Sequence, residues 1–289
     1  MNIPRKPKWL NKKIDYRSMR EVGEMLRNLN LNTVCEGAKC PNIGECFGNR
    51  TATFMILGNI CTRNCKFCAI PEGKPTEIDS NEAKNIAQAA KQLALNHVVI
   101  TSVTRDDIED GGATHFANCI QELKKTLAKA SIEVLIPDLK GNKSSLDIII
   151  DAKPNIINHN VETVPSLYPV VRQMAEYKKS LEVLRYIKEK DNTIYTKSGI
   201  MLGLGETREE VLSLFDDLIS VNCDILTIGQ YLPPSFKHAL LKEYVKPEVF
   251  EEYKQIGSEK GFKFVASGPY VRSSYNAALY AILGQCGAK

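Results

Sequence analysis

The sequence of 289 residues has one tryptophan, four histidines and no tract of biased composition. It contains no apolar run of the roughly 18 residues that a membrane-spanning helix needs. Its first fifteen residues are basic and lack an apolar stretch of signal-peptide length. These absences predict a cytoplasmic globular protein with no membrane partner. The net charge of +4 is too small for a surface that follows a phosphate backbone, so we expect no nucleic-acid partner.

Cysteine is the residue type that stands out. The chain has nine cysteines, and six of them fall between Cys35 and Cys68. A reducing compartment disfavours a disulfide framework, so this cluster indicates metal or redox chemistry. The remaining three, Cys119, Cys223 and Cys286, are scattered along the chain. Cys119 is expected to be a buried helix residue, and we assign no role to Cys223 and Cys286.

Short apolar runs alternate with helical patterns along most of the chain. The runs that predict strands are 53–57, 97–103, 132–137, 155–158, 193–202, 224–229 and 262–267. The main helical patterns between them are 80–96, 114–130, 180–190 and 208–222. Ser80 and Thr207 precede acidic first turns and are predicted helix caps. Alternation of this kind predicts an α/β protein with parallel strands, and about six units indicate a partial (β/α)6 TIM-like barrel.

We expect the chain to consist of three segments. Residues 1–50 form an N-terminal extension with a helix over 16–31 and a loop over 35–48, the loop being rich in glycine, proline and asparagine. Residues 51–267 form the barrel, and residues 268–289 form a C-terminal tail. We expect the two extensions to close over the active face, where the loops that follow the strands meet.

Cys61, Cys65 and Cys68 have the spacing C-x-x-x-C-x-x-C and directly follow the first predicted barrel strand. Thiolates favour zinc, copper(I) or iron–sulfur clusters. Structural zinc needs four protein ligands, and no fourth cysteine or histidine stands close behind these three. The spacing therefore favours an iron–sulfur cluster with one iron open to a small molecule.

This motif, with Phe67 before its last cysteine, resembles that of the radical S-adenosylmethionine superfamily. The resemblance implies a 4Fe-4S cluster whose open iron binds S-adenosylmethionine and cleaves it to a hydrogen-abstracting radical. It also implies cofactor contacts in three short segments, for which ordinary turns or a solvated loop remain the alternative. These residues are Gly111 and Gly112 in D-G-G-A, where Ala113 replaces the usual acidic residue, Asn160 and Glu162 in N-H-N-V-E-T-V, and Gly199, Met201 and Gly203 in G-I-M-L-G-L-G-E.

Cys35, Cys40 and Cys46 form a second incomplete set with the spacing C-x4-C-x5-C. From the residues alone, the missing ligand could be Cys286, a histidine or an oxygen donor in the tail. Two unfinished cysteine sets together with V-R-S-S-Y in the tail resemble the lipoyl synthase family over 16–275.

That resemblance implies an auxiliary 4Fe-4S cluster held by the second cysteine set and Ser274, with Ser273 as the alternative ligand. Arg272 is expected to position the tail. A serine oxygen is a weaker iron ligand than a thiolate, which suits a cluster that must lose an iron.

The activity implied by the resemblance is a sulfurtransferase reaction. Two sulfur atoms enter at C6 and C8 of a protein-bound octanoyl-lysine, two S-adenosylmethionine molecules are cleaved, and the auxiliary cluster is sacrificed. The implied partners are octanoylated lipoyl-carrier domains or the glycine-cleavage H protein, an electron donor such as flavodoxin or ferredoxin, and iron–sulfur assembly factors. Arg105, Tyr231 and His238 either line the substrate cavity or make local hydrogen bonds and packing contacts.

Two other functions remain open. One is a different radical sulfur-insertion enzyme, similar to biotin synthase. The other is a non-catalytic iron–sulfur electron carrier, which would need full cysteine ligation and would not cleave S-adenosylmethionine. The strand–helix alternation over most of the chain is more machinery than a carrier requires.

Overall fold

The computed structural model describes residues 5–11, 16–48, 52–275 and 277. Their contacts define two compact units. The first unit contains residues 16–48, 52–63, 69–157, 274, 275 and 277. The second unit contains residues 5–11, 64–68 and 158–273. Cys286 lies outside the described residues.

The strands follow one another in the sheet in chain order from β1 to β8, and this order does not close on itself. In the first unit, β1 (Asn32–Thr33) is antiparallel to β2 (Thr53–Ile56), and β2, β3 (His97–Ser102) and β4 (Ser131–Leu135) are parallel. In the second unit, β6 (Tyr195–Leu202), β7 (Ile225–Gln230) and β8 (Phe264–Gly268) are parallel. The short β5 (Ile156–Asn158) stands between β4 and β6 in this order.

The predicted α/β class with an open, barrel-like parallel sheet is confirmed. All seven predicted strands are present, with bounds that differ by at most two residues. Every residue of β2 is buried, as is typical of a parallel strand covered on both faces. The short β1 was not predicted, because two residues carry no periodic signal. The closure of the two extensions over the active face stays a prediction, and so do the three predicted segments 1–50, 51–267 and 268–289.

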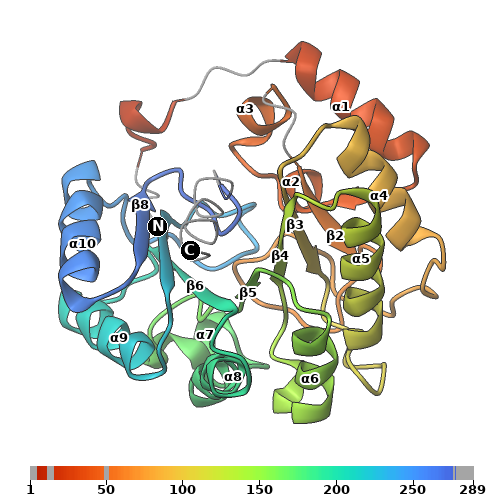
Figure 1. Cartoon of the computed structure of the whole chain (residues 1–289). Coiled ribbons are helices and arrows are strands. Elements are labelled where there is room, and N and C mark those ends of the chain that lie inside the picture. The colour runs from red at the N-terminus through yellow and green to blue at the C-terminus, as the bar shows by residue number, and fades with distance from the viewer. Residues whose placement is uncertain (1–4, 12–15, 49–51, 276, 278–289) are drawn as a thin grey trace. The chain divides into compact units, whose positions relative to one another are not determined.

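The helices of the first unit include three that the sequence did not indicate. The unit contains α1 (Tyr16–Asn28), α2 (Val34–Gly37), α3 (Ile43–Gly48), α4 (Glu82–Gln92), α5 (Ala113–Thr126), the 3-10 turn Leu139–Gly141 and α6 (Lys143–Asp151), and the three are α2, α3 and α6. Figure 1 shows α4 and α5 side by side, and the two helices pack against each other. The prediction of a loop over 35–48 was wrong, because α2 and α3 lie there. The Thr33 side chain caps α2 by accepting a hydrogen bond from the amide of Glu36.

The second unit surrounds its three parallel strands with helices and short turns. They are the 3-10 turns Lys8–Leu10 and Pro165–Leu167, α7 (Tyr168–Val171), α8 (Tyr177–Lys190), α9 (Arg208–Ser220) and α10 (Pro247–Lys260). Its core joins Phe215 of α9, Phe250 of α10 and Ile228 of β7, all of which are buried. Thr207 forms the predicted cap in a reciprocal capping box with Glu210.

Other predicted features have plain outcomes. The prediction of Ser80 as a cap was wrong, because α4 begins after Asn81 and its side chain makes no capping hydrogen bond. Cys119 of α5 is buried as expected, and Cys223 is buried in the core of the second unit. No helix in the described ranges is long and apolar enough to cross a bilayer.

Candidate active site

The cysteine loop begins at a strained turn directly after β2. Leu57 and Gly58 both have positive φ angles, of 67° and 92°. This backbone conformation is costly for leucine, of order 1–3 kcal/mol. Two side chains hold Leu57 in place: Glu82 Oε2 accepts its amide at 2.9 Å, and Arg105 Nη1 donates to its carbonyl at 3.2 Å. Arg105 also pairs with Asp107 at 2.9 Å, so the local hydrogen-bonding role expected for it is confirmed.

Cys61 lies in the first unit and already has the surroundings of a thiolate ligand. Its Sγ accepts hydrogen bonds from the backbone amides of Arg63 at 3.4 Å and Thr104 at 3.3 Å. Amide hydrogen bonds to cysteine sulfur are one of the ways in which proteins tune iron–sulfur clusters. The donor set at Cys61 therefore fits a cluster ligand.

Cys65 and Cys68 lie in the second unit, where a tight turn joins them through a hydrogen bond from the Cys68 amide to the Cys65 carbonyl at 3.0 Å. His238 Nε2 lies 3.0 Å from the carbonyl oxygen of Cys68. Lys66 donates its amide to the carbonyl of Val171 at 2.9 Å and accepts from the amide of Ala239 at 2.7 Å. The segments that follow β5 and β7 thus form hydrogen bonds with this part of the cysteine loop.

Aromatic packing supports the same segment. Phe67 packs against a small apolar cluster that contains Leu204, Tyr231 and Leu241. The Tyr231 hydroxyl donates to the Ala239 carbonyl at 2.8 Å. For Tyr231 and His238, the structure therefore confirms local hydrogen bonding and packing.

Asn160 and Glu162 follow β5 and are joined to β6 and to the tail. The Asn160 side chain donates from Nδ2 to Ser273 Oγ at 2.7 Å and to Glu162 Oε1 at 3.1 Å. Its Oδ1 is buried and has no hydrogen-bond partner in the described part of the chain. A buried acceptor without a donor is costly, so this atom suits a hydroxyl group of a bound ligand.

Glu162 occupies a left-handed conformation, with φ at 68°. Its amide donates to the carbonyl of Gly199, and its carbonyl accepts from the amide of Met201, both at 2.9 Å. Burial raises the pKa of Glu162, while Arg172 and Asn160 act in the opposite direction. Three predicted cofactor residues are therefore brought together by one strained backbone segment.

Gly199 lies next to the side chains of Asn160 and Ser273. A Cβ atom on Gly199 would lie 2.5 Å from Thr227 Oγ1, 2.9 Å from Asn160 Oδ1 and 3.3 Å from Ser273 Oγ. Only glycine fits among these three polar side chains, which we call the cradle. The unpartnered Asn160 oxygen in the cradle suits a hydrogen-bond donor of a ligand.

The other predicted glycines have a structural reason of their own. Gly112 has a φ of 91°, and its Cβ would lie 2.3 Å from Leu57 Cδ1, while Gly111 has a φ of 62° and faces Leu139 in the same way. Gly203 has a φ of 100°, and a Cβ atom there would lie 2.5 Å from the Glu243 carbonyl oxygen. Cofactor contacts from these three residues stay a prediction, because turns and close packing already account for them.

Arg172 is a residue that sequence analysis did not single out. It is 8% exposed, and its Nη1 donates to the Asn160 carbonyl at 3.1 Å, to the Tyr168 hydroxyl at 3.2 Å and to Ser180 Oγ at 3.2 Å. Burial by itself lowers the pKa of Arg172, but nearby Tyr168, Glu162 and Cys65 together raise it. A buried cation thus lies in the electrostatic reach of a predicted cluster ligand. A single arginine between two predicted elements gives no signal of this in the sequence.

The second cysteine set lies in and between α2 and α3 of the first unit. Cys35 is buried, and its pKa is raised to about 12, mainly by burial, which a backbone hydrogen bond involving Thr53 opposes and to which the charges of Cys40 and Cys46 add. Thiolates are the ligands that iron–sulfur clusters prefer, so the residue types of this set fit such a cluster.

The R-S-S-Y tail is divided between the two units, and each part makes hydrogen bonds within its own unit. Arg272 Nη1 donates to the carbonyl of Val271 at 2.7 Å, within the tail itself, and Ser273 Oγ receives the Asn160 amide. In the first unit, the Tyr275 hydroxyl donates to Glu45 Oε1 at 2.7 Å, next to Cys46. Ser274 stands between these two bonds.

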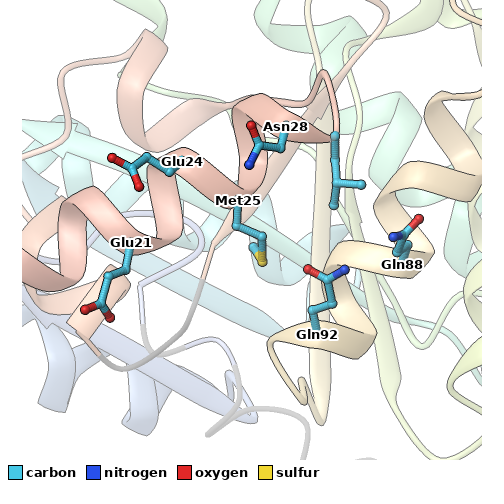
Figure 2. A pocket seen from close by; sticks show the side chains of 7 residues that line it. Glu21, Glu24, Met25, Asn28, Gln88 and Gln92 are labelled. Carbon is cyan, nitrogen blue, oxygen red and sulfur yellow. The ribbon is translucent and has the colours of Figure 1, made fainter.

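The ligand assignments as a whole stay predictions. Within the described ranges, no group of three His, Cys, Asp or Glu side chains is already arranged to hold a metal ion. A separate hollow of about 520 Å³ lies in the first unit and contains none of the predicted site residues. Figure 2 shows its lining from α1 and α4: Glu21, Glu24, Met25, Asn28, Gln88 and Gln92.

Known structures share this fold. The chain is similar to methylornithine synthase, with a TM-score of 0.57, 15% identity and coverage of 89% of this chain and 79% of that one. It is also similar to Streptococcus suis SuiB bound to S-adenosylmethionine, with a TM-score of 0.57, 14% identity and coverage of 87% and 60%. At such low identity, these two likenesses concern the fold alone.

Sequence relatives are much closer. The profile of the radical SAM superfamily matches residues 55–218. The chain is 56% identical over 273 residues to the lipoyl synthase of Caldanaerobacter subterraneus subsp. tengcongensis, covering 94% of this chain and 96% of that protein. It is 53% identical over 264 residues to the lipoyl synthase of Aquifex aeolicus, covering 91% and 96%. The chain therefore belongs to the lipoyl synthase family of the radical SAM superfamily.

Proposed function

We propose that this chain is a sulfurtransferase that inserts sulfur at C6 and C8 of an octanoyl group carried on a protein lysine, which gives the lipoyl group. The observation that carries the proposal is the hydrogen bond of 2.7 Å from Asn160 Nδ2 to Ser273 Oγ. It joins the loop that carries Asn160 to the tail with the two adjacent serines. A carrier of electrons would need neither element.

Two iron–sulfur clusters and S-adenosylmethionine are the cofactors of this proposal. Cys61, Cys65 and Cys68 hold one cluster, and the second is held by Cys35, Cys40, Cys46 and Ser274. When bound, the first cluster and S-adenosylmethionine supply hydrogen-atom abstraction, and the second cluster supplies sulfur. The amide hydrogen bonds to Cys61 Sγ and the three cysteines of the second set support these assignments.

The remaining residues bind and orient. Asn160 Oδ1 accepts a ribose hydroxyl, and Gly199 allows the nucleoside to approach β6. Arg172 offers a cation to the carboxylate of the methionine part, and its buried surroundings strengthen that attraction. Glu162 is held by β6 on one side of the same space.

The partners follow from this chemistry. The substrate is an octanoylated lipoyl-carrier domain or the glycine-cleavage H protein. A flavodoxin or ferredoxin donates electrons, and iron–sulfur assembly factors rebuild the consumed cluster. The eight described cysteines are free thiols, which suits a reducing compartment such as the cytoplasm.

An anaerobic assay tests the function. The chain is reconstituted with iron and sulfide and mixed with dithionite, S-adenosylmethionine and an octanoyl-lysine peptide, and mass spectrometry follows the products. The expected result is a peptide that gains two sulfur atoms, with about two 5′-deoxyadenosines per product. Deoxyadenosine with an unchanged peptide would move the substrate elsewhere. A cluster-loaded chain that forms no deoxyadenosine would support the electron carrier.

A further inference from the structure

Arg63 lies inside the cysteine loop, and its side chain is 8% exposed. It donates from Nε and Nη2 to both carboxylate oxygens of Asp106 at 2.6 and 2.9 Å. It also donates from Nη1 and Nη2 to both oxygens of Asp138 at 2.6 and 2.8 Å. One guanidinium is therefore held by two bidentate carboxylates, the strongest geometry available to arginine. We call Arg63, Asp106 and Asp138 the loop clamp.

The loop clamp joins three strand ends of the first unit. Arg63 follows β2, Asp106 follows β3 and Asp138 follows β4. The carboxylate of Asp138 is 2% exposed and that of Asp106 is 22% exposed. Loss of one partner from a buried pair leaves the other charge uncompensated, which is strongly destabilising. The loop thus has a defined position that does not depend on its thiols.

A series of hydrogen bonds links the loop clamp to Cys61. Thr62 donates its amide and its hydroxyl to the carbonyl of Thr104 at 3.1 and 3.0 Å, and its Oγ1 accepts from the amide of Asp106 at 3.1 Å. Cys61 Sγ then accepts the amides of Arg63 and Thr104. Hydrogen bonds through Thr62 and Thr104 therefore connect the loop clamp to the Cys61 thiol.

The net charge of the loop clamp excludes one possible role for Arg63. Two carboxylates face one guanidinium, so the group carries a net negative charge. It therefore offers no positive charge to stabilise the thiolates of Cys61, Cys65 and Cys68. Four of the five guanidinium N–H donors are already used by the two carboxylates. Arg63 therefore acts by holding the cysteine loop in place and not by stabilising the negative charge of a thiolate.

We propose that Arg63 is a positioning residue that presets Cys61 for iron before any iron is bound. The proposal rests on the function proposed above for the role of Cys61, but the clamp consists of protein groups alone, so its effect on Cys61 can be measured without iron. Lysine cannot replace arginine here, because a compact ammonium group cannot bind two carboxylates bidentately.

The test measures the metal-free, reduced chain directly. Each cysteine is alkylated with iodoacetamide, and mass spectrometry gives the rate at each site. Arg63→Met, the milder Asp106→Asn and the charge-preserving Arg63→Lys are compared with the wild type. We expect Cys61 to react on the order of tenfold slower in all three variants, because the thiolate is the reactive form and it loses the amide donors that stabilise it. The rates at Cys35, Cys40 and Cys46 serve as an internal reference and should not change.

A matched control breaks a buried ion pair elsewhere. Lys188 and Asp224 are paired at 2.9 Å and are 11% and 5% exposed, so Lys188→Met tests general loosening of the protein. It should leave the Cys61 rate unchanged. An equal slowing at Cys61 in Lys188→Met, wild-type rates in Arg63→Lys, or wild-type rates in folded Asp106→Asn would each overturn the proposal.

Reconstitution gives a second readout. We expect iron to fall from about eight to about four atoms per chain in the clamp variants, because one of two 4Fe-4S clusters is lost. Failure of the wild type to cleave S-adenosylmethionine would overturn the proposed function, whereas the alkylation rates of the metal-free chain would still decide the role of Arg63.

Discussion

The Tyr275 hydroxyl donates a hydrogen bond of 2.7 Å to Glu45 Oε1, which ties the residue after Ser274 to the helix that carries Cys46. On the other side of Ser274, the Ser273 hydroxyl accepts the Asn160 amide at 2.7 Å. The two adjacent serines, which the sequence alone cannot distinguish, thus have different surroundings. Ser273 is bound to Asn160 of the proposed nucleoside site, and Ser274 precedes Tyr275, which is bound to Glu45 beside Cys46 in the sequence.

We therefore predict different effects of the two serine-to-alanine changes. Ser274→Ala removes the proposed serine ligand, so iron affinity at the proposed auxiliary site should fall on the order of 100-fold. Ser273→Ala should keep that iron and weaken binding of S-adenosylmethionine, because Asn160 loses its acceptor. Mössbauer spectroscopy and iron analysis of the reconstituted variants measure the first effect. The assignment is wrong if Ser273→Ala loses the auxiliary iron and Ser274→Ala keeps it.

Gly199→Ala tests the cradle beside Asn160. The added Cβ would meet Thr227 Oγ1 at 2.5 Å and Asn160 Oδ1 at 2.9 Å. We expect a loss of about 1–3 kcal/mol in stability from overpacking, together with weaker binding of S-adenosylmethionine in equilibrium dialysis. Gly268→Ala in β8 is the matched control, because its Cβ meets only Val271 Cγ2 at 3.6 Å. Unchanged binding in a folded Gly199→Ala variant would place the nucleoside elsewhere.

Arg172→Lys keeps the charge and removes the planar group that reaches Asn160, Tyr168 and Ser180. We expect binding of S-adenosylmethionine to weaken about tenfold or more, because the Asn160 backbone loses its anchor and the carboxylate loses a bidentate donor. The exposed Arg208, paired with Glu252 at 2.8 Å, provides the control Arg208→Lys, which should bind as the wild type does. Equal affinities of both variants for S-adenosylmethionine would mean that Arg172 does not contribute to its binding.

The sequence predicted the strands well because each is a short, strongly apolar run between turn residues. It could not predict α2 and α3, because Gly37, Pro41 and Gly44 obscure helices of four and six residues. The six clustered cysteines could be found because their spacing is local. Arg63 and Arg172 could not, because their partners lie as many as 75 residues away or act through a backbone carbonyl. Long-range pairing leaves no periodic signal in a single sequence.

Asp110 offers a test of pH dependence at the start of α5. Its carboxylate accepts the amides of Gly112 and Thr114, both at 2.8 Å. Burial by itself raises the pKa of Asp110, but the hydrogen bonds from Thr114 and Gly112 outweigh it and lower the pKa below the ordinary value of 3.8. A carboxylate whose pKa is lowered by folding stabilises the protein above its unfolded-state pKa, and this contribution is lost as the pH falls through the folded-state pKa.

Asp110→Asn should therefore lower the free energy of unfolding by about 1 kcal/mol at neutral pH, because charged hydrogen bonds are replaced by neutral ones. Urea unfolding of wild type and variant, measured over a series of pH values, gives this difference directly. The difference should shrink as the pH falls below 3.8, since the wild-type carboxyl group then becomes neutral as well. A difference that stays constant down to the lowest pH would mean that the loss comes from altered geometry of the D-G-G-A turn and not from the charge of Asp110.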